Sequence, residues 1–437
     1  MNKYKQFNAY KDTHLPWCPR IPCEWSLIPN KGLLIKRKDV VGSAWNQFTM
    51  LSLTKKGVIV RDVENASGKF SSDMSGYQRV KSGDLIFCLF DIEETPRTVG
   101  LSNEDGMITG AYTVLNCKNQ ILAKFFEMFY IAMDDGKFLS YMYSGLRNTI
   151  RPPVFLSLKT PVPSEVEMEK IIKFVKSKIV IIDKMINKKQ KLVKLLQEKR
   201  QALITQAITK GCDSKVSMKD SRVKWMGEIP ESWKIYSIKN LLSSSLGIKI
   251  GPFGSQLKLD DMVINGFKVY GQENVTYKNW ELGTRRISQE KFNTLSVYKI
   301  RGDDVLVTMM GTIGNSIVVP KVIDLGIMDS HLIRLRLNQE LILPEFLVQN
   351  FLNNVVTKSE VEYLSNGSTM SGLNSKIIKS LTISLPPLEE QEKLLSYVEK
   401  INRTTETIIK KTKRQIGKLD EFKSALIYNA VTGKIKV

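Results

Sequence analysis

The stretch SEVEMEKIIKFVKSKIVIIDKMINKKQKLVKLLQEKRQALITQAITK, residues 164–210, decides the fold of this chain. Alternating steps of four and three residues along it select twelve positions, and ten of them are apolar: Met168, Ile172, Val175, Ile179, Ile182, Ile186, Val193, Leu196, Leu203 and Ala207. The other two are Lys189 and Arg200. This spacing is a heptad seam, which is typical of helices that pack on another helix. We therefore predict one long helix from Ser164 to Lys210 that buries its seam against a partner.

A second copy of the same stretch supplies that partner. Residues 163–211 align without gaps with residues 386–434, at an offset of 223, and 14 of the 49 positions are identical. The pattern W-x3-I-P-x2-W also occurs twice, at Trp17–Trp25 and at Trp225–Trp233, at an offset of 208. Two motifs repeated in the same order indicate a tandem duplication. We predict a second long helix from about Leu388 to Thr432, packed on the first.

Each long helix follows a block that combines strands and short helices. Short runs rich in β-branched and aromatic residues predict strands near residues 58–60, 84–90, 304–307, 316–319 and 331–337. Short helices are predicted near residues 123–133 and 344–353, at equivalent places in the two copies. The fold class we expect is α+β. It has two globular mixed α/β domains in a tandem pseudo-repeat, separated by two long helices that form an antiparallel coiled coil.

Composition and charge narrow the class of protein. The 437 residues carry 65 Lys+Arg and 44 Asp+Glu, a net charge of +21, and 42% of them are hydrophobic. This hydrophobic content supports packed cores and excludes a disordered tail protein. No apolar run reaches the roughly 18 residues of a membrane span, and the polar start has no signal-peptide core. Five scattered cysteines suit a reducing cytoplasm, where we expect the protein, and the positive charge points to a polyanion partner.

The sequence contains no motif for catalysis. It has no G-x4-G-K-[ST] phosphate loop, no G-x-G-x-x-G after a strand, and no Asn/Asp-Pro-Pro-aromatic signature of an amino-methyltransferase. Only His14 and His331 offer imidazoles for acid–base chemistry. His14, Cys18 and Cys23 could be metal ligands, but their spacing fits no common zinc pattern, and ordinary loop or core roles are favoured. We predict no catalytic residue and no metal site on this chain.

Binding features are more numerous, and they lie on polar, glycine-containing loops of the second block. These loops are GPFGSQ at 251–256, YGQEN at 270–274, MGTIGN at 310–315 and NGST at 366–369. Such loops let backbone N–H groups approach phosphates, and side chains of Gln, Asn, Arg and Lys can read base edges. Ordinary turn chemistry explains any single loop equally well. Residues 165–211 carry 12 basic and 5 acidic residues, which indicates either a solvated helix surface or phosphate contact.

Together, these motifs resemble those of the specificity, or DNA-recognition, subunit of a Type I restriction–modification enzyme. The resemblance rests on the paired W-x3-I-P-x2-W motifs, on LPPLEEQ at 385–391, and on the helix ends ALITQAITKG at 202–211 and ALIYNAVTG at 425–433. GPFGS at 251–255 and GTIG at 311–314 also match. The first block has no equivalent of these two loops, although Ser144-Gly145-Leu146-Arg147-Asn148 resembles the loop at 366–369.

The resemblance implies four parts: target-recognition domain 1 at 1–163, spacer helix 1 at 164–211, target-recognition domain 2 at 212–385 and spacer helix 2 at 386–437. Each domain would read one half of a bipartite sequence in double-stranded DNA, and the spacer would set the gap. A member of this family is not itself an enzyme. It would assemble with two methyltransferase subunits and with restriction/translocase subunits, and S-adenosylmethionine, ATP and Mg²⁺ would bind only to those partners.

Polar residues on turns of the globular blocks are the candidates for DNA contact: Arg79, Arg97, Arg147 and Asn148 in the first block, and Ser255, Gln256, Lys258, Gln272, Asn274, His331 and Ser368 in the second. We also expect that deleting four residues within Gln197–Lys210 changes the gap between the half-sites. Two rival functions remain. A stand-alone DNA-modifying enzyme would transfer methyl groups by itself, and a coiled-coil scaffold for proteins would show no salt-dependent DNA binding.

Overall fold

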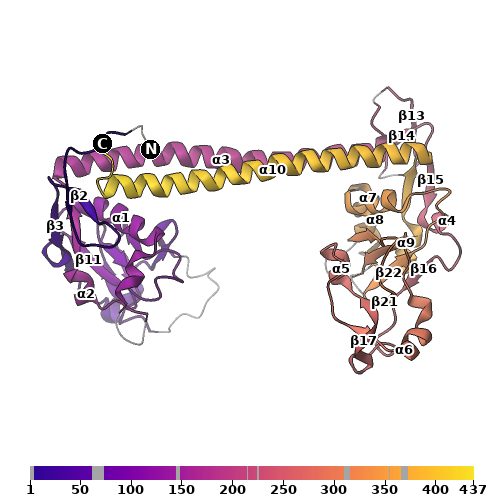
Figure 1. Ribbon diagram of the computed structural model, residues 1–437, viewed down its shortest axis with the longest axis horizontal. Coiled ribbons are helices and arrows are strands. Elements are labelled where there is room, and N and C mark those ends of the chain that lie inside the picture. The colour runs from indigo at the N-terminus through magenta and orange to yellow at the C-terminus, as the bar shows by residue number, and fades with distance from the viewer. Residues whose placement is uncertain are drawn as a thin grey trace. The chain divides into compact units, whose positions relative to one another are not determined.

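The structure, a computed structural model, describes residues 4–61, 73–143, 148–213, 215–223, 226–309, 315–353, 355–365 and 373–437. The chain divides into two compact units. Unit 1 comprises Met1–Gln190 and Lys413–Val437, and unit 2 comprises Lys191–Thr412. Each unit therefore holds a globular block and part of each long helix (Figure 1). The chain enters unit 2 along the first long helix and returns to unit 1 along the second.

The two long helices confirm the prediction from the heptad seam. α3 spans Glu165–Lys210 and α10 spans Leu388–Val431, each within one residue of the predicted bounds. Acidic residues occupy the first turn of both helices, where they interact favourably with the free N–H groups and the helix dipole. The ten apolar seam residues of α3 are all buried or half-buried. The helix is therefore held by packing along its whole length and not by helix propensity alone.

Polar side chains near the seam pair across to the opposite helix. Within unit 1, Lys189 Nζ donates to Gln415 Oε1 at 2.6 Å, and Lys423 Nζ lies 2.7 Å from Asp183 Oδ1. Residue numbers rise along α3 where they fall along α10, so the helices run antiparallel. The predicted coiled coil is thus present, and Lys189 and Lys423 are hydrogen-bonded to the opposite helix.

Unit 1 is built on an antiparallel four-stranded sheet of order β4-β11-β8-β9. Helix α1 packs on this sheet and buries Phe125, Phe126, Phe129 and Tyr130. The predicted helix near 123–133 is therefore confirmed. In chain order the elements are β1 Tyr10–Asp12, β2 Arg20–Pro22, β3 Ser26–Pro29, η1 Asn30–Gly32, β4 Leu34–Lys36, η2 Gly42–Gln47, β5 Leu51–Thr54, β6 Gly57–Val60, β7 Gln78–Val80, β8 Leu85–Phe87, β9 Val99–Leu101, β10 Gly106–Ile108, β11 Thr113–Cys117, α1 Gln120–Asp135, η3 Phe138–Met142, α2 Pro152–Ser157 and β12 Lys159–Val162.

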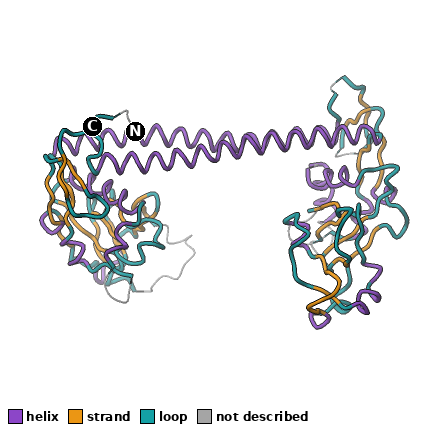
Figure 2. The backbone as a smooth tube through the Cα atoms, viewed as in Figure 1, coloured by secondary structure: helices purple, strands orange, loops and turns teal. Residues whose placement is uncertain are grey.

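Unit 2 has a four-stranded sheet of order β16-β22-β19-β20 and a three-stranded sheet of order β18-β17-β21. Strands are drawn in orange in Figure 2. The predicted strands and the predicted helix at 344–353 are all present. The elements are β13 Met218–Asp220, β14 Glu228–Pro230, β15 Lys234–Ser237, α4 Ile238–Leu241, β16 Ile248–Ile250, η4 Leu259–Asp261, β17 Met262–Tyr270, α5 Gln272–Thr276, β18 Arg286–Ile287, α6 Gln289–Thr294, η5 Ser296–Tyr298, β19 Val305–Thr308, β20 Ser316–Val318, β21 Gly326–Met328, β22 Leu332–Leu335, α7 Pro344–Asn353, α8 Val355–Ser365, α9 Ser375–Ser380 and β23 Thr382–Leu385.

The two four-stranded sheets are copies of one another. β4, β11, β8 and β9 of unit 1 correspond to β16, β22, β19 and β20 of unit 2, in the same order and all antiparallel. The pair β3–β12 likewise corresponds to β15–β23. The duplication therefore includes the globular blocks, where the sequence shows only its two ends.

The W-x3-I-P-x2-W motif of each copy packs against the end of the long helix that begins in the other copy. Trp25 and Pro22 lie against Gly433, just after α10, and Pro230 and Trp233 lie against Gly211, just after α3. Gly433 has a φ of 70°, and a Cβ atom there would overlap the ring of Pro22. Only glycine accepts both constraints without strain. The motif is thus explained as the surface on which a helix end packs. Trp225 lies outside the described residues.

Candidate nucleic-acid interface

The described residues that border the polar loops of unit 2 lie at one end of its four-stranded sheet. Gly251, the first residue after β16, donates its N–H to the carbonyl of Leu332 at 2.9 Å. Met309, which precedes the loop at 310–314, donates to His331 O at 3.1 Å and accepts from Leu373 N at 3.4 Å. Residues 310–314 and 366–372 lie outside the described residues, and their described neighbours are hydrogen-bonded to one another. Gly251, Met309 and Leu373, the described residues that border these three loops, therefore lie at one end of the sheet.

Gly251 is required where it stands because the chain passes very close to another segment. A Cβ atom at this position would overlap the carbonyl of Asp329, in the turn before β22. Pro252 is buried, and Phe253, the next residue, is 71% exposed. The glycine thus fixes the root of the turn, and the proline keeps it rigid. The side chains that follow are presented to solvent.

Two hydrogen bonds hold the side chain of Gln256, and both are accepted by its amide oxygen. Its Oε1 accepts from the N–H of Phe253 at 3.2 Å and from the hydroxyl of Tyr298 at 2.9 Å. Among the described residues its amide nitrogen has no hydrogen-bond partner, and the side chain is exposed. An amide held by its oxygen presents two N–H donors in a set direction, which is what an acceptor on a base edge requires. Ser255 and Lys258 are exposed on the same turn.

His331 lies in a second polar cluster at the same end of the sheet. Arg285 contacts Asp329 at 2.6 Å and Glu273 at 3.4 Å, while the Ser330 hydroxyl bonds to Asp329 at 2.9 Å and to His331 Nδ1 at 3.1 Å. Burial raises the pKa of Asp329, but the ion pair with Arg285 and the bonds from Ser330 outweigh it and lower the pKa overall. The ionised carboxylate therefore orders the turn, and the His331 side chain remains about half exposed, at 51%.

The structure corrects the prediction that Asn274 is available for DNA contact. Its side chain is fully buried, accepts from Gly271 N at 2.8 Å, and donates to the carbonyls of Asn279 and Leu282 at 2.9 and 2.8 Å. All its polar capacity is used to shape the turn around α5, so it has nothing left for a base. Gln272, two residues earlier, is partly exposed and stays a candidate.

Unit 1 repeats the same loop geometry with different residues. Cys88 N donates to Thr98 O at 2.8 Å, as Thr308 N donates to Asn315 O at 2.9 Å in unit 2. Ile150 N donates to Leu89 O at 2.7 Å, the counterpart of the bond from Leu373 to Met309. The described residues that border 89–97 and 144–149 are therefore hydrogen-bonded like those that border 310–314 and 366–372. Sequence comparison found no counterpart of the first of these loops, because the correspondence lies in backbone hydrogen bonds.

Of the first-block candidates, Asn148 belongs to this loop end. Its carbonyl accepts from Asp91 N at 2.8 Å, and its side chain is exposed. Arg147 lies outside the described residues, as does Ser368 of the second block. Arg79 lies elsewhere, on β7 of the β7–β10 pair, where its guanidinium is 5.5 Å from the ring centre of Phe48. The structure does not place Arg79 on the loops that contain Asn148.

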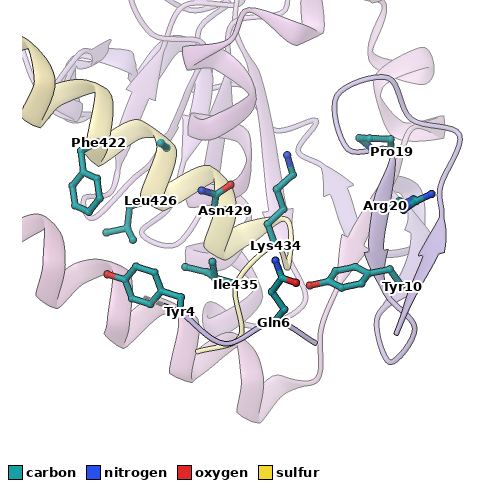
Figure 3. Close-up of a pocket in the computed structure, with 11 residues that line it drawn as sticks. Tyr4, Gln6, Tyr10, Pro19, Arg20, Phe422, Leu426, Asn429, Lys434 and Ile435 are labelled. Carbon is teal, nitrogen blue, oxygen red and sulfur yellow. The ribbon is translucent and has the colours of Figure 1, made fainter. Parts of the chain in front are cut away.

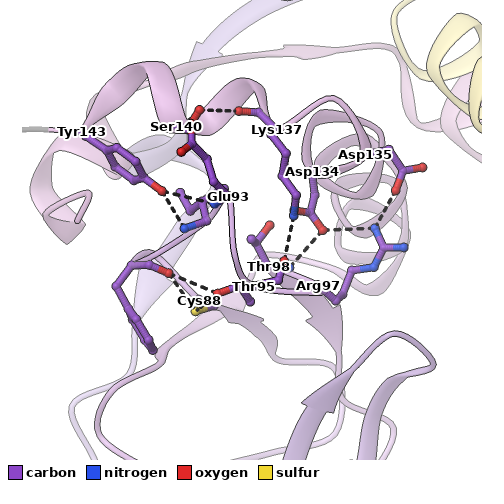
Figure 4. A network of polar contacts seen from close by, with 12 residues as sticks. Cys88, Glu93, Thr95, Arg97, Thr98, Asp134, Asp135, Lys137, Ser140 and Tyr143 are labelled. Atoms are coloured by element: carbon purple, nitrogen blue, oxygen red, sulfur yellow. Dashed lines mark hydrogen bonds and ion pairs between the residues drawn. The ribbon is translucent and has the colours of Figure 1, made fainter. Parts of the chain in front are cut away.

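Arg97 is a second correction, because it anchors a loop instead of facing solvent. Its guanidinium lies 3.2 Å from Asp134 and 2.9 Å from Asp135, at the end of α1, and its side chain is only 18% exposed (Figure 4). Asp134 also accepts from Thr98 N at 3.0 Å and contacts Lys137 Nζ at 2.8 Å. Asp134 therefore ties the 89–97 loop to α1, and Arg97 is part of that clamp.

Unit 1 also contains a groove of about 920 Å³ near the end of α10 (Figure 3). Tyr4, Phe422, Leu426 and Ile435 form an apolar side, and polar side chains including Asn429 and Lys434 line the rest. None of the predicted DNA-contact residues that the structure describes lines it. The groove is therefore separate from the loop end of the sheet.

Neither a metal site nor a membrane span is found among the described residues. No group of three or more His, Cys, Asp or Glu side chains is placed to hold a metal ion, so His14, Cys18 and Cys23 are not brought together as ligands. Burial raises the pKa of Cys18 to about 12, which keeps this thiol protonated at neutral pH. No described helix combines the length and apolar content that a bilayer crossing demands.

Comparison with known proteins agrees with this architecture. Residues 230–418 match the family model of the Type I restriction modification DNA specificity domain. The putative type I restriction enzyme MjaX specificity subunit of Methanocaldococcus jannaschii is 24% identical over 99% of this chain and 98% of its own length. The type I restriction enzyme MjaVIII specificity subunit of the same organism is 24% identical over 76% of this chain and 75% of its own.

Solved structures share the fold of the whole chain. The HsdS subunit from Thermoanaerobacter tengcongensis has a TM-score of 0.54 and 15% identity, over 95% of this chain and 98% of that one. A chain from a study of complex assembly and conformational transition of the type I R-M system has a TM-score of 0.65 and 14% identity, over 94% of this chain and 98% of that one. Residues 230–418 therefore match the Type I restriction modification DNA specificity domain, and the whole chain is similar in sequence and fold to Type I restriction–modification specificity subunits.

Proposed function

We propose that this chain is the sequence-reading subunit of a Type I restriction–modification complex, and that each unit reads one half of a bipartite DNA target. One observation carries the proposal: both units have the same four-stranded sheet, and polar loops with exposed side chains start from the same end of it. A duplicated scaffold with different loops supplies two similar docking geometries that read two different sequences.

The reading surface we propose for unit 2 consists of the exposed side chains at this loop end: Ser255, Gln256, Lys258, Gln272 and His331, together with Ser368. For unit 1 it consists of Asn148, whose carbonyl accepts from Asp91 of the 89–97 loop, and of Arg147, which we include from the sequence alone. Glutamine and asparagine pair best with adenine, and arginine and lysine pair with guanine or with phosphate. We propose domain boundaries at 1–163 and 212–385 for the two readers, with 164–211 and 386–437 as the spacer helices.

The partners we propose are two methyltransferase subunits and restriction/translocase subunits, in the cytoplasm. α3 leaves Val180, Ile181 and Met185 exposed in unit 1 and Leu192 and Leu195 exposed in unit 2. Apolar side chains at heptad spacing on the outer side of a helix suit a helix of another protein. In this assembly the chemistry and its cofactors would belong to the partner subunits, and this chain would supply recognition only.

The test is the methylome of a host that expresses the chain with its methyltransferase subunit. A split target with two constant half-sites is the expected pattern. Gln256→Ala and Gln272→Ala should relax the sequence at the second half-site and leave the first unchanged. Gln289→Ala, an exposed glutamine on α6, is the matched control and should change neither half-site.

The rival functions give different results in the same system. Methyl transfer by the purified chain alone would favour a stand-alone enzyme. An absence of duplex binding that weakens with salt would favour a protein-only scaffold. If both alanine variants retain the parental target and affinity, the proposed reading residues are wrong.

A further inference from the structure

On one face of the unit 2 sheet, basic side chains outnumber the carboxylates that pair with them. Lys249 on β16 lies directly opposite Arg334 on β22, and Arg336 follows two residues later on the same face. Arg336 pairs with Asp304 at 2.8 Å. Among the described residues no carboxylate forms an ion pair with Lys249 or Arg334. Three cations therefore share one carboxylate.

Arg334 retains its charge in a buried position. Its side chain is 4% exposed, and its guanidinium donates to the carbonyls of Val297 and Lys299 at 3.2 and 2.5 Å. Its Nε has no hydrogen-bond partner among the described residues. Burial and the nearby charges of Arg336 and Arg301 lower the pKa to about 10, so the group stays protonated at neutral pH. Carbonyl oxygens satisfy the N–H groups, but they do not cancel the charge.

The fold itself does not require all three cations, because unit 1 lacks the two on the second strand. Val114 occupies the place of Arg334 in the matching strand, and Asn116 occupies the place of Arg336 and donates to Asp84 at 3.2 Å. The counterpart of Lys249 is Arg37, which forms an ion pair with Asp84. In unit 2 the aspartate is taken by Arg336, so the first-strand cation is left without a carboxylate. The excess charge is specific to unit 2.

The unpaired lysine lies next to the proposed reading turn. Lys249 is partly exposed, and its Nζ is 5.2 Å from the ring centre of Tyr298. The hydroxyl of the same tyrosine donates to Gln256 Oε1 at 2.9 Å. Tyr298 thus connects the lysine to the side chain that we propose to read a base. A phosphate bound by Lys249 would lie one side chain away from that base contact.

We infer that Lys249 binds a backbone phosphate of the second half-site and that Arg334 and Arg336 strengthen the positive potential at this point. The inference rests on the proposed function and adds to it a sequence-independent contact. A lysine ammonium is a point charge that suits a phosphate oxygen, and such contacts position the protein without reading sequence. Unit 1, with Arg37 engaged by Asp84, has no matching contact at this place.

The experiment compares Lys249→Gln with the parent in the full chain, assembled with its methyltransferase subunits, on a duplex that carries the methylated sequence. Affinity is measured by fluorescence anisotropy between about 50 and 300 mM salt. The variant should make the slope of log affinity against log salt less negative by about 0.9 and weaken binding about fivefold at 0.15 M salt. Lys249→Arg should retain both values, and Lys239→Gln, an exposed lysine on α4, controls for loss of net charge.

The methylated sequence should be the same for all four proteins. An unaltered salt slope in Lys249→Gln would overturn the phosphate contact. A change in the methylated sequence would also overturn it, because Lys249 would then be reading a base. If the parent complex itself shows no sequence-selective binding, the proposed function fails, and that result is distinct from a failure of the lysine variant alone.

Discussion

Replacing Asp134 by asparagine should loosen the first reading loop and leave the second half-site untouched. The Asp134 carboxylate is 1% exposed and bonds to Thr98 N, Arg97 and Lys137 at 3.0, 3.2 and 2.8 Å. Asparagine keeps one oxygen for the N–H of Thr98 but loses the charge that holds the two cations. Because Arg97 and Lys137 are then partly buried without this counter-charge, the cost should be about 3 kcal/mol.

Such a loss is large enough to measure. For a unit of this size, each kcal/mol corresponds to about 2–4 °C in the melting temperature, so unit 1 should melt about 10 °C lower. Asp135→Asn is the matched control. Asp135 is 29% exposed and contacts the same arginine at 2.9 Å, so its replacement should cost less than about 1 kcal/mol.

Differential scanning calorimetry measures the melting, and the methylome measures the reading. Asp134→Asn should relax the first half-site because the clamp no longer fixes the 89–97 loop, while the second half-site keeps its sequence. Equal effects of the two asparagine variants would show that the buried position does not matter. Relaxation at the second half-site would refute the assignment of one unit to each half.

Three further outcomes are expected. One heptad can be removed from both helices by deleting Gln190–Leu196 together with Ile408–Arg414. This deletion keeps the Lys189–Gln415 and Arg200–Glu406 contacts and shortens the pair by about 10 Å. Methylome sequencing should then show constant half-sites and a gap shorter by up to about three base pairs. Gly433→Ala forces a Cβ atom into Pro22 at positive φ and should lower the free energy of unfolding of unit 1 by about 2–3 kcal/mol in chemical denaturation. Because the pKa of Asp329 is lowered, its stabilisation is complete above the unfolded value of about 3.9 and is lost as pH falls through the folded value. Asp329→Asn should therefore destabilise unit 2 at pH 7, and the difference from the parent should shrink as the solution is acidified below the unfolded value.

The heptad experiment replaces the four-residue deletion within Gln197–Lys210 that the sequence suggests. That stretch contains Ile204, Ala207 and Ile208, which are buried in one cluster with Trp233. Deleting residues there would remove part of the unit 2 core, and deleting them from one helix would also shift its register against the other. The sequence predicts the helix and its seam, because both are local and periodic. It does not show which part of the helix belongs to a domain core.

The difference between local pattern and distant contact also explains why the structure assigns internal roles to two residues, Asn274 and Arg97, that the sequence suggested for DNA contact. Asn274 and Gln256 are both amides on polar turns, and only contacts distant in sequence separate them. Leu282 and Asn279 enclose the first, whereas Tyr298 holds the second by one oxygen and leaves its nitrogen free. Arg97 likewise looks like an exposed cation until α1 brings in Asp134, 37 residues later. Residue type predicts what a side chain can bond to, and burial decides whether any of that capacity is left for a ligand.

The differences between the two copies are as informative as their likeness. Backbone hydrogen bonds at the loop ends are preserved between Leu89–Ile150 and Met309–Leu373, although the loops that follow Leu89 and Met309 share no motif. Backbone bonds tolerate any side chain, so a duplicated sheet can keep its shape while its loops diverge. Identical loops on both units would read the same bases twice. Loops that differ on a preserved scaffold, with Arg334 where the first copy has Val114, fit a reader whose two half-sites differ and whose halves hold the DNA backbone with unequal charge.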